Sequence, residues 1–120
     1  MMDLLSPKIS VEYVQNATIT TLTDQKILEQ ADIQALENSI MPLVDSSAKI
    51  NLIMDFSNVK FLTSAVLGLL IRISKKVYES QGRLRLCGID AKILEIFKIT
   101  RLDRVFEIYE DRYDALQGLK

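Results

Sequence analysis

The sequence predicts an α/β fold: one domain with a mixed, largely parallel β-sheet of about five strands and about four helices packed on it. Two observations lead to this prediction. Apolar residues alternate at period two in some segments and recur at helical spacing in others, so strands and helices follow one another along the chain. Segment 50–56 is apolar at nearly every position, as in a strand covered on both faces. A chain of 120 residues has room for one such domain, 1–120.

The N-terminal part of the chain predicts a hairpin and then a helix. Side chains typical of strands occupy every second position in 9–13 and in 17–21, which indicates a β-hairpin. Helical spacing predicts a helix over 32–44, with Asp32 capping its first turn. Pro42 lies inside this helical pattern and removes an intrahelical hydrogen bond, so we expect either a kink or an early end there.

A second helix is expected from Ser64 to Ser80, after the buried strand. Gly82 follows it and is suited to a left-handed C-terminal cap. The polar side chains of this segment are expected to face water. The side chains expected to face the sheet are Leu67, Leu70, Ile71 and Val77.

The C-terminal part predicts two further strands and two short helices. A strand is expected at Leu84–Cys87, where Leu84 and Leu86 alternate with Arg83 and Arg85. We expect both arginines to point outward. Asp90 opens a short helix. The last strand is expected at Val105, Phe106 and Ile108, followed by a terminal helix over 111–119 with Tyr113, Leu116 and Leu119 on one side.

The charge balance argues against nucleic acid as a partner. The chain has 15 basic and 16 acidic residues, a net charge of -1, and no Lys/Arg block that could neutralise a phosphate backbone. The longest apolar segment, 66–73, is far shorter than the roughly 20 residues of a membrane-spanning helix. Residues 1–7 lack the pattern of a signal peptide. We therefore expect a cytoplasmic protein that binds neither nucleic acid nor a membrane.

Few residues could carry catalytic or metal chemistry. The chain has no histidine, and its single cysteine, Cys87, lies in an apolar strand where a buried thiol is expected. Asp55 ends the central strand, at the sheet edge where ligand sites of α/β proteins lie. No second carboxylate or glycine-rich phosphate loop accompanies it. We expect no enzyme activity, no metal and no cofactor.

Ser64 has two interpretations that the residues leave open. Serine is a preferred N-cap, so Ser64 could simply cap the second helix. A helix N-terminus also stabilises an anion, including a phosphate on the serine itself. Thr63 is a weaker candidate acceptor, since a loop threonine more often packs or caps.

Two strings of residues resemble one known family. The strings 54–70 and 96–108 look like the STAS domain family and, more narrowly, bacterial anti-sigma factor antagonists. In that family the strand ends in Asp-Leu-Ser or similar, and the serine after the aspartate of Asp-Ser-(Ser or Thr)-Gly-Leu-Gly accepts phosphate. Ser64 matches this acceptor, with Thr63 at the position of the aspartate. The resemblance extends over about residues 9–116.

The resemblance implies a protein that switches partners. Such a protein binds an anti-sigma factor that is also a serine kinase, and the sigma factor is released. The kinase uses ATP to phosphorylate Ser64 and the phosphoprotein then leaves; a serine phosphatase is the expected counterpart. The implied partner-binding residues are Asn58, Phe61, Thr63, Ser64, Ala65, Leu67 and Gly68.

Two alternatives remain beside the switch. The domain could be a constitutive, non-phosphorylated scaffold or interaction subunit of a signalling or transport complex, which the departures at Thr63 and Val66 from the family motif favour. A small enzyme or ligand-binding domain would need a pocket at the strand ends near Asp55 and Thr63.

Overall fold

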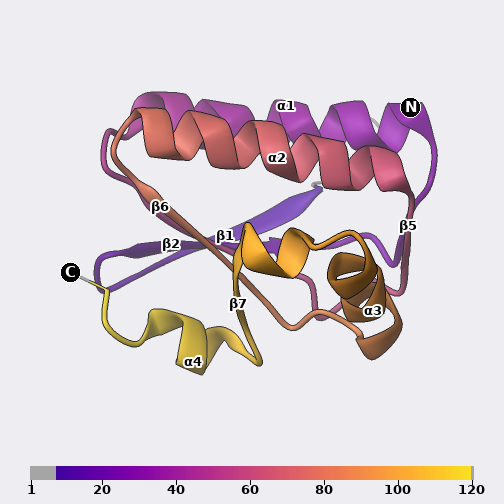
Figure 1. The fold of residues 1–120 in the computed structure, drawn as a ribbon. Helices are drawn as coiled ribbons and strands as arrows, with labels where there is room; N and C mark the ends of the chain where they lie inside the picture. Colours follow the sequence, from indigo (N-terminus) through magenta and orange to yellow (C-terminus); the bar gives the residue numbers. More distant parts are fainter. Residues whose placement is uncertain (1–7, 120) are drawn as a thin grey trace.

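A sheet of five strands lies between helices in the computed structural model of the chain, which describes residues 8–119 (Figure 1). The strand order is β1-β2-β4-β6-β7, and every neighbouring pair is parallel except β1 and β2. The predicted fold class, a mixed and largely parallel sheet with helices packed on it, is therefore confirmed. Residues 1–7, for which no signal peptide is expected, lie outside the described part of the chain.

The elements follow one another as strand, helix and strand after an initial hairpin. The main sheet contains β1 (Ile9–Val14), β2 (Ala17–Leu22), β4 (Asn51–Asp55), β6 (Arg83–Cys87) and β7 (Glu107–Tyr109). The short strands β3 (Lys26–Ile27) and β5 (Phe61–Leu62) form a separate parallel pair. The helices are α1 (Gln30–Ser46), α2 (Ser64–Glu79), α3 (Ala91–Ile99) and α4 (Arg112–Leu116), with a 3-10 turn at Leu102–Arg104.

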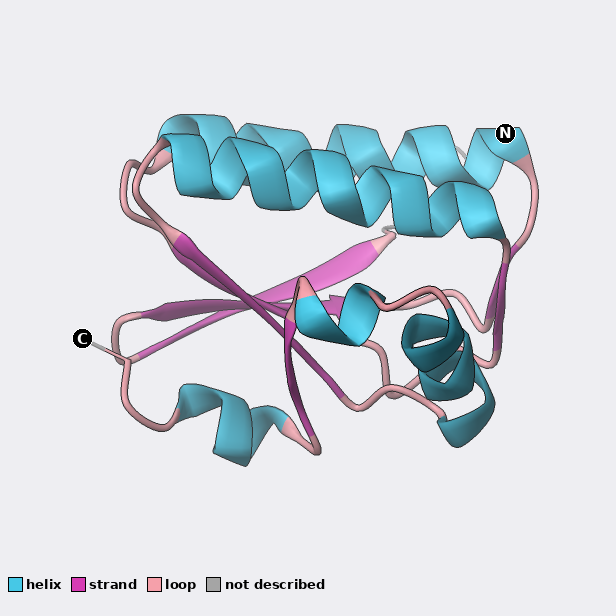
Figure 2. Cartoon of the chain, viewed as in Figure 1, coloured by secondary structure: helices cyan, strands magenta, loops and turns pink. Residues whose placement is uncertain are grey.

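The two faces of the sheet are covered unequally. Helices α1 and α2 lie side by side over one face, and α4 lies alone on the other (Figure 1). Figure 2 shows the twisted strands between these two layers. Because successive residues of a strand point to opposite faces, Leu52 and Met54 belong to the large core under α1 and α2, whereas Ile53 packs in a smaller cluster with Ala115 of α4.

The predicted hairpin is confirmed, and α1 is longer than predicted. β1 and β2 pair in register from Ile9 opposite Leu22 to Val14 opposite Ala17. α1 begins at Gln30 with Glu29 as its N-cap, so the prediction that Asp32 is the cap is wrong. Asp32 is instead the third helical residue, and its carboxylate accepts the backbone N–H of Glu29 at 3.5 Å. The helix continues beyond the exposed Pro42 to Ser46, which excludes the early end.

Helix α2 begins at Ser64 as predicted, but Thr63 is its N-cap, so the interpretation of Ser64 as the N-cap is wrong. Ile71 is 46% exposed, which corrects the prediction that it faces the sheet. It lies just beyond the edge of the buried stripe. That stripe consists of Val66, Leu67, Leu69, Leu70, Ile73, Ser74 and Val77.

The C-terminal end of α2 differs from the prediction in which residue is left-handed. Gln81 has a φ of 65°, whereas Gly82 has no positive φ. Gly82 is needed for space instead, because a Cβ atom there would lie 2.4 Å from the carbonyl oxygen of Ile50. The glycine thus allows the chain to enter β6 directly beside the start of β4.

Only one of the two arginines of β6 points to solvent as predicted. Arg83 is exposed, but Arg85 is 5% exposed and is covered by α4. Its Nη1 atom donates to the carbonyl oxygens of Ala115 at 2.8 Å and Gln117 at 2.6 Å. The alternation along β6 predicted the correct face of the sheet for Arg85, but α4 covers that face.

The last strand and the last helix are shorter than predicted. β7 begins only at Glu107, so Val105 and Phe106 precede it. Phe106 is buried and packs edge-on against Phe97 with ring centroids 6.0 Å apart. α4 ends at Leu116, and Tyr113 is exposed rather than packed. Within residues 8–119 the structure contains no helix with the length and apolar character to span a membrane.

Candidate functional site

The loop from β4 to α2 is held in place by two buried residues. Phe56 donates its backbone N–H to the carbonyl oxygen of Cys87 at 2.9 Å, and Val59 donates to the carbonyl oxygen of Phe56 at 2.9 Å. The side chains of Phe56 and Val59 are fully buried in the core. Residues 57 and 58 form a turn at the surface between them. The turn therefore has a fixed position relative to the sheet.

The second half of this loop is bound to the segment that precedes α1. The Asn58 side chain donates from Nδ2 to the carbonyl oxygen of Leu22 at 3.1 Å. The backbone N–H groups of Lys60 and Phe61 both donate to the carbonyl oxygen of Gln25, at 2.8 and 3.2 Å. Strand β5 then pairs with β3 and leads into α2 (Figure 1). These contacts attach the segment that leads into α2 to the chain before α1.

The two hydroxyl groups at the start of α2 have different environments. The Ser64 side chain is exposed at the first helical residue. The Oγ1 atom of Thr63 is buried and has no hydrogen-bond partner among the described residues. A hydroxyl needs access to accept a phosphoryl group, so Ser64 is available in this conformation and Thr63 is not. The free N–H groups and the dipole of a 16-residue helix favour a negative charge at this end.

Most residues of the predicted partner-binding surface are accessible. Asn58, Ser64 and Ala65 are exposed, and Phe61 is 55% exposed. Thr63 and Gly68 are partly exposed. Leu67 is 6% exposed and packs in the core, which corrects its inclusion in a contact surface.

Two residues before α1 extend this surface. The ammonium of Lys26 lies 5.6 Å from the centroid of the Phe61 ring, and Leu28 is also exposed. The pairing of β3 with β5 brings these residues to the loop. Two-residue strands have no recognisable period, so the sequence contained no signal for this contact.

Asp55 is buried and fully engaged at the end of β4. The whole residue is 5% exposed, and Oδ1 of its side chain accepts the backbone N–H of Ser57 at 2.9 Å. Oδ2 accepts from Nε and Nη2 of Arg112 at 3.2 and 3.0 Å. Both oxygens therefore hold the chain together, which favours a structural role over a catalytic one. Arg112 was not predicted, because it lies 57 residues away from Asp55 in the sequence.

Arg112 also binds two other strands. Nη1 donates to Glu12 at 2.7 Å and Nη2 donates to the hydroxyl of Thr21 at 2.8 Å. The hydrogen bond with Glu12 is the main reason why the pKa of Arg112 is raised, although burial acts in the opposite direction. The neighbouring Cys87 is buried as predicted, and burial, followed by the charge of Asp55, raises the pKa of its thiol to about 12. The thiol is therefore protonated and unreactive at neutral pH.

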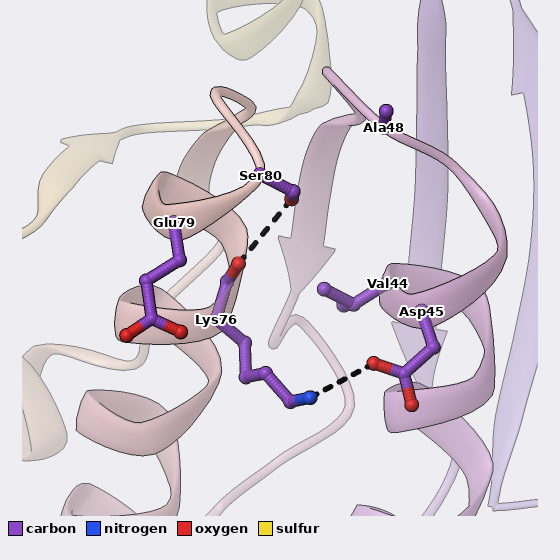
Figure 3. A pocket seen from close by; sticks show the side chains of 6 residues that line it. All are labelled: Val44, Asp45, Ala48, Lys76, Glu79 and Ser80. Atoms are coloured by element: carbon purple, nitrogen blue, oxygen red, sulfur yellow. Dashed lines mark hydrogen bonds and ion pairs between the residues drawn. The ribbon is translucent and has the colours of Figure 1, made fainter.

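Two hollows of the structure are lined by other residues than Asp55, Cys87 and Arg112. One, of about 260 Å³, lies between the C-terminal ends of α1 and α2 and is crossed by an ion pair of 3.1 Å from Lys76 to Asp45 (Figure 3). The other, of about 340 Å³, is lined by Ile89, Leu94, Ile108, Tyr109 and Glu110. Neither is lined by Asp55 or Thr63, so neither is the pocket that a ligand-binding site at these residues would need.

Known proteins resemble this chain over most of its length. A Bordetella bronchiseptica protein named as an anti-sigma factor antagonist, BtrV, is 23% identical over 113 residues, which are 94% of this chain and 95% of that protein. The solved structure of an anti-sigma factor antagonist from Mycobacterium paratuberculosis is 25% identical, with a TM-score of 0.80 over 92% of this chain and 91% of that chain.

A second similar solved structure is that of a phosphorylated protein. It is the Bacillus cell fate determinant SpoIIAA in its phosphorylated form, with 15% identity and a TM-score of 0.66 over 88% of this chain and 94% of that chain. The sequence model of the STAS domain matches residues 10–115 of this chain. Because that match includes most of the 120 residues, the chain belongs to the STAS domain family.

Proposed function

We propose that this protein is an anti-sigma factor antagonist that binds an anti-sigma factor and is switched off by phosphorylation of Ser64. One observation carries the proposal: Ser64 is exposed at the first residue of α2, while the adjacent hydroxyl of Thr63 is buried. The names of BtrV and of the mycobacterial relative support the general function. The partner surface is the set of accessible residues Asn58, Phe61, Thr63, Ser64, Ala65 and Gly68.

The physical basis of the switch is charge placed in a contact surface. A phosphoserine adds a charge of about −1.5 to −2 and three acceptor oxygens. The N-terminus of α2 accommodates this charge, so the fold remains intact. The exposed ring of Phe61 and the methyl group of Ala65 form an apolar part of the surface. Binding there becomes unfavourable, since the phosphate would have to be desolvated.

The chain acts as a substrate rather than as an enzyme in this scheme. An anti-sigma factor with serine kinase activity transfers the γ-phosphoryl group of ATP to the Ser64 hydroxyl, which loses its proton, and ADP leaves. A serine phosphatase restores the hydroxyl by hydrolysis, in which water takes up the phosphoryl group and inorganic phosphate leaves. Sigma factors act in the cytoplasm, so this function implies a cytoplasmic location.

The test combines phosphosite mapping with binding. Wild-type protein, Ser64→Ala and the matched control Ser57→Ala, another exposed serine of the same loop, are incubated with ATP in lysate of the native cells. We expect phosphate on Ser64 in the wild type and in the control, and none at residue 64 of Ser64→Ala. Ser64→Ala should keep its affinity for the anti-sigma factor, while Ser64→Asp should lose at least about tenfold, or about 1.4 kcal/mol.

A different result would favour the constitutive scaffold. If Ser64 stays unmodified while other kinase substrates in the same lysate are labelled, the phosphorylation step is wrong. If Ser64→Asp also binds the anti-sigma factor as tightly as the wild type, the switch as a whole is wrong.

A further inference from the structure

We propose that Arg112 positions the loop that presents Ser64, acting from the opposite face of the sheet through the buried carboxylate of Asp55. The effect on Ser64 rests on the function proposed above, whereas the effect on the loop does not. Arg112 belongs to α4, which covers one face, and Ser64 begins α2 on the other (Figure 1). The inference links these two layers through one side chain.

The Asp55 carboxylate has two separate functions, one for each oxygen. Oδ1 accepts the N–H of Ser57, the first exposed residue of the loop, at 2.9 Å. Oδ2 accepts from Nη2 and Nε of Arg112, at 3.0 and 3.2 Å. One orientation of the carboxylate therefore makes the hydrogen bonds with Arg112 and the hydrogen bond with the loop at the same time. A buried carboxylate without its cation raises the free energy of the folded state strongly, so the side chain would rotate toward water.

Arg112 is held by partners other than Asp55. Glu12 of β1 binds Nη1 at 2.7 Å, and Thr21 of β2 binds Nη2 at 2.8 Å. The planar guanidinium group thus connects three strands, β1, β2 and β4, which a single ammonium group could not do with the same geometry. Its position is set by the sheet, so it acts as a fixed donor for the carboxylate.

Gly88 encloses the carboxylate from another side. A Cβ atom at Gly88 would lie 2.8 Å from Oδ1 of Asp55 and 3.1 Å from the backbone nitrogen of Ser57. The N–H of Gly88 donates to the carbonyl oxygen of Glu110, just before α4, at 3.1 Å. The carboxylate, the turn and the entry to α4 are therefore packed as one unit. Loss of Arg112 leaves the carboxylate little freedom except to break its bond with Ser57.

The first part of the test needs no partner protein. Amide hydrogen exchange is measured by NMR for the wild type, Arg112→Leu and the matched control Arg83→Leu. Arg83 is an exposed arginine of β6, and its ion pair is with Glu107 of β7. We expect the amides of Ser57 and Val59 to exchange at least about tenfold faster in Arg112→Leu, relative to the change at Leu52 in β4. The control should leave this ratio unchanged.

The conservative variant separates positioning from general destabilisation. Arg112→Lys keeps the charge but loses the fork, so we expect an exchange rate of Ser57 between those of the wild type and Arg112→Leu. If Arg112→Leu does not fold, a selective increase at Ser57 in Arg112→Lys supports the proposal. Exchange ratios within about twofold of the wild type in the folded variants, or an equal increase at Leu52, would overturn it.

The second part of the test measures the consequence for Ser64. Phosphorylation of Ser64 in native lysate is followed over time in the wild type and in Arg112→Leu, and we expect a slower rate in the variant. An equal rate despite a loosened loop would overturn the link to Ser64. If the wild type itself is not phosphorylated, the proposed function fails, and the exchange measurement still decides whether Arg112 positions the loop.

Discussion

At the scale of single residues, Gly88 shows how one backbone position fixes the end of a strand. Its φ is 68°, and a Cβ atom there would lie 2.8 Å from the Asp55 carboxylate. Gly88→Ala therefore adds backbone strain and also displaces a buried charged group. We expect it to lower the free energy of unfolding by about 2–4 kcal/mol, measured by urea denaturation.

Gly118→Ala is the matched control for this prediction. Gly118 has a similar φ of 76°, but no atom of the described residues other than its chain neighbours lies within 4 Å of the Cβ position. This variant has the backbone strain alone, so the expected loss is about 1 kcal/mol. Equal losses in the two variants would mean that Asp55 and the Ser57 turn can move aside without loss of stability. The description of the carboxylate, the turn and the entry to α4 as one packed unit would then be wrong.

At the scale of elements, α2 contains a glycine that helix formation does not need. Gly68 lies inside the helix. Apart from the helix backbone, a Cβ atom there would come within 4 Å of only one atom in residues 8–119, Arg72 Nη1 at 3.9 Å. Gly68→Ala should therefore raise the free energy of unfolding by about 1 kcal/mol. Gly82→Ala, with its 2.4 Å approach to Ile50, is the control with the opposite sign. Urea denaturation of both variants measures the difference.

The same substitution separates stability from binding. Gly68 lies on the proposed partner surface and is partly exposed. If that surface binds the anti-sigma factor, the added methyl group should weaken binding although the protein is more stable. Unchanged affinity together with increased stability would remove Gly68 from the contact surface.

The sequence predicted best those elements whose residues carry their own periodicity. The hairpin, the buried β4 and the start of α2 at Ser64 follow from local spacing. β3 and β5 are too short for any period, and they were missed although they hold the loop before Ser64. The accessible hydroxyl at this helix start was predictable, whereas the burial of Thr63 depends on tertiary packing.

At the scale of the whole molecule, the largest error concerned the face covered by α4. The alternation in β6 placed Arg85 on the correct face, but its partners are carbonyl oxygens 30 and 32 residues further along the chain. The bond from Arg112 to Asp55 has a separation of 57 residues. No local pattern contains such information. The polar alternation of β6 therefore predicts a face open to solvent, whereas α4, a helix of five residues, covers that face at Arg85.

Ala115 tests how closely this small layer fits the sheet. It is fully buried in the cluster that contains Ile19, Ile53 and Cys87. Ala115→Leu should lower the free energy of unfolding by about 1–3 kcal/mol through overpacking, while the exposed Ala91→Leu should change it by less than about 0.5 kcal/mol.

The position of Ala115 also connects this prediction with the loop before Ser64. α4 carries both Ala115 and Arg112, so pushing the helix away from the sheet should withdraw the arginine from Asp55. We therefore expect faster amide exchange at Ser57 in Ala115→Leu, as in Arg112→Leu, and wild-type exchange in Ala91→Leu. A destabilised Ala115→Leu in which Ser57 remains as protected as Leu52 would show that Arg112 holds its place without the rest of α4, and the layer would then not act as one body.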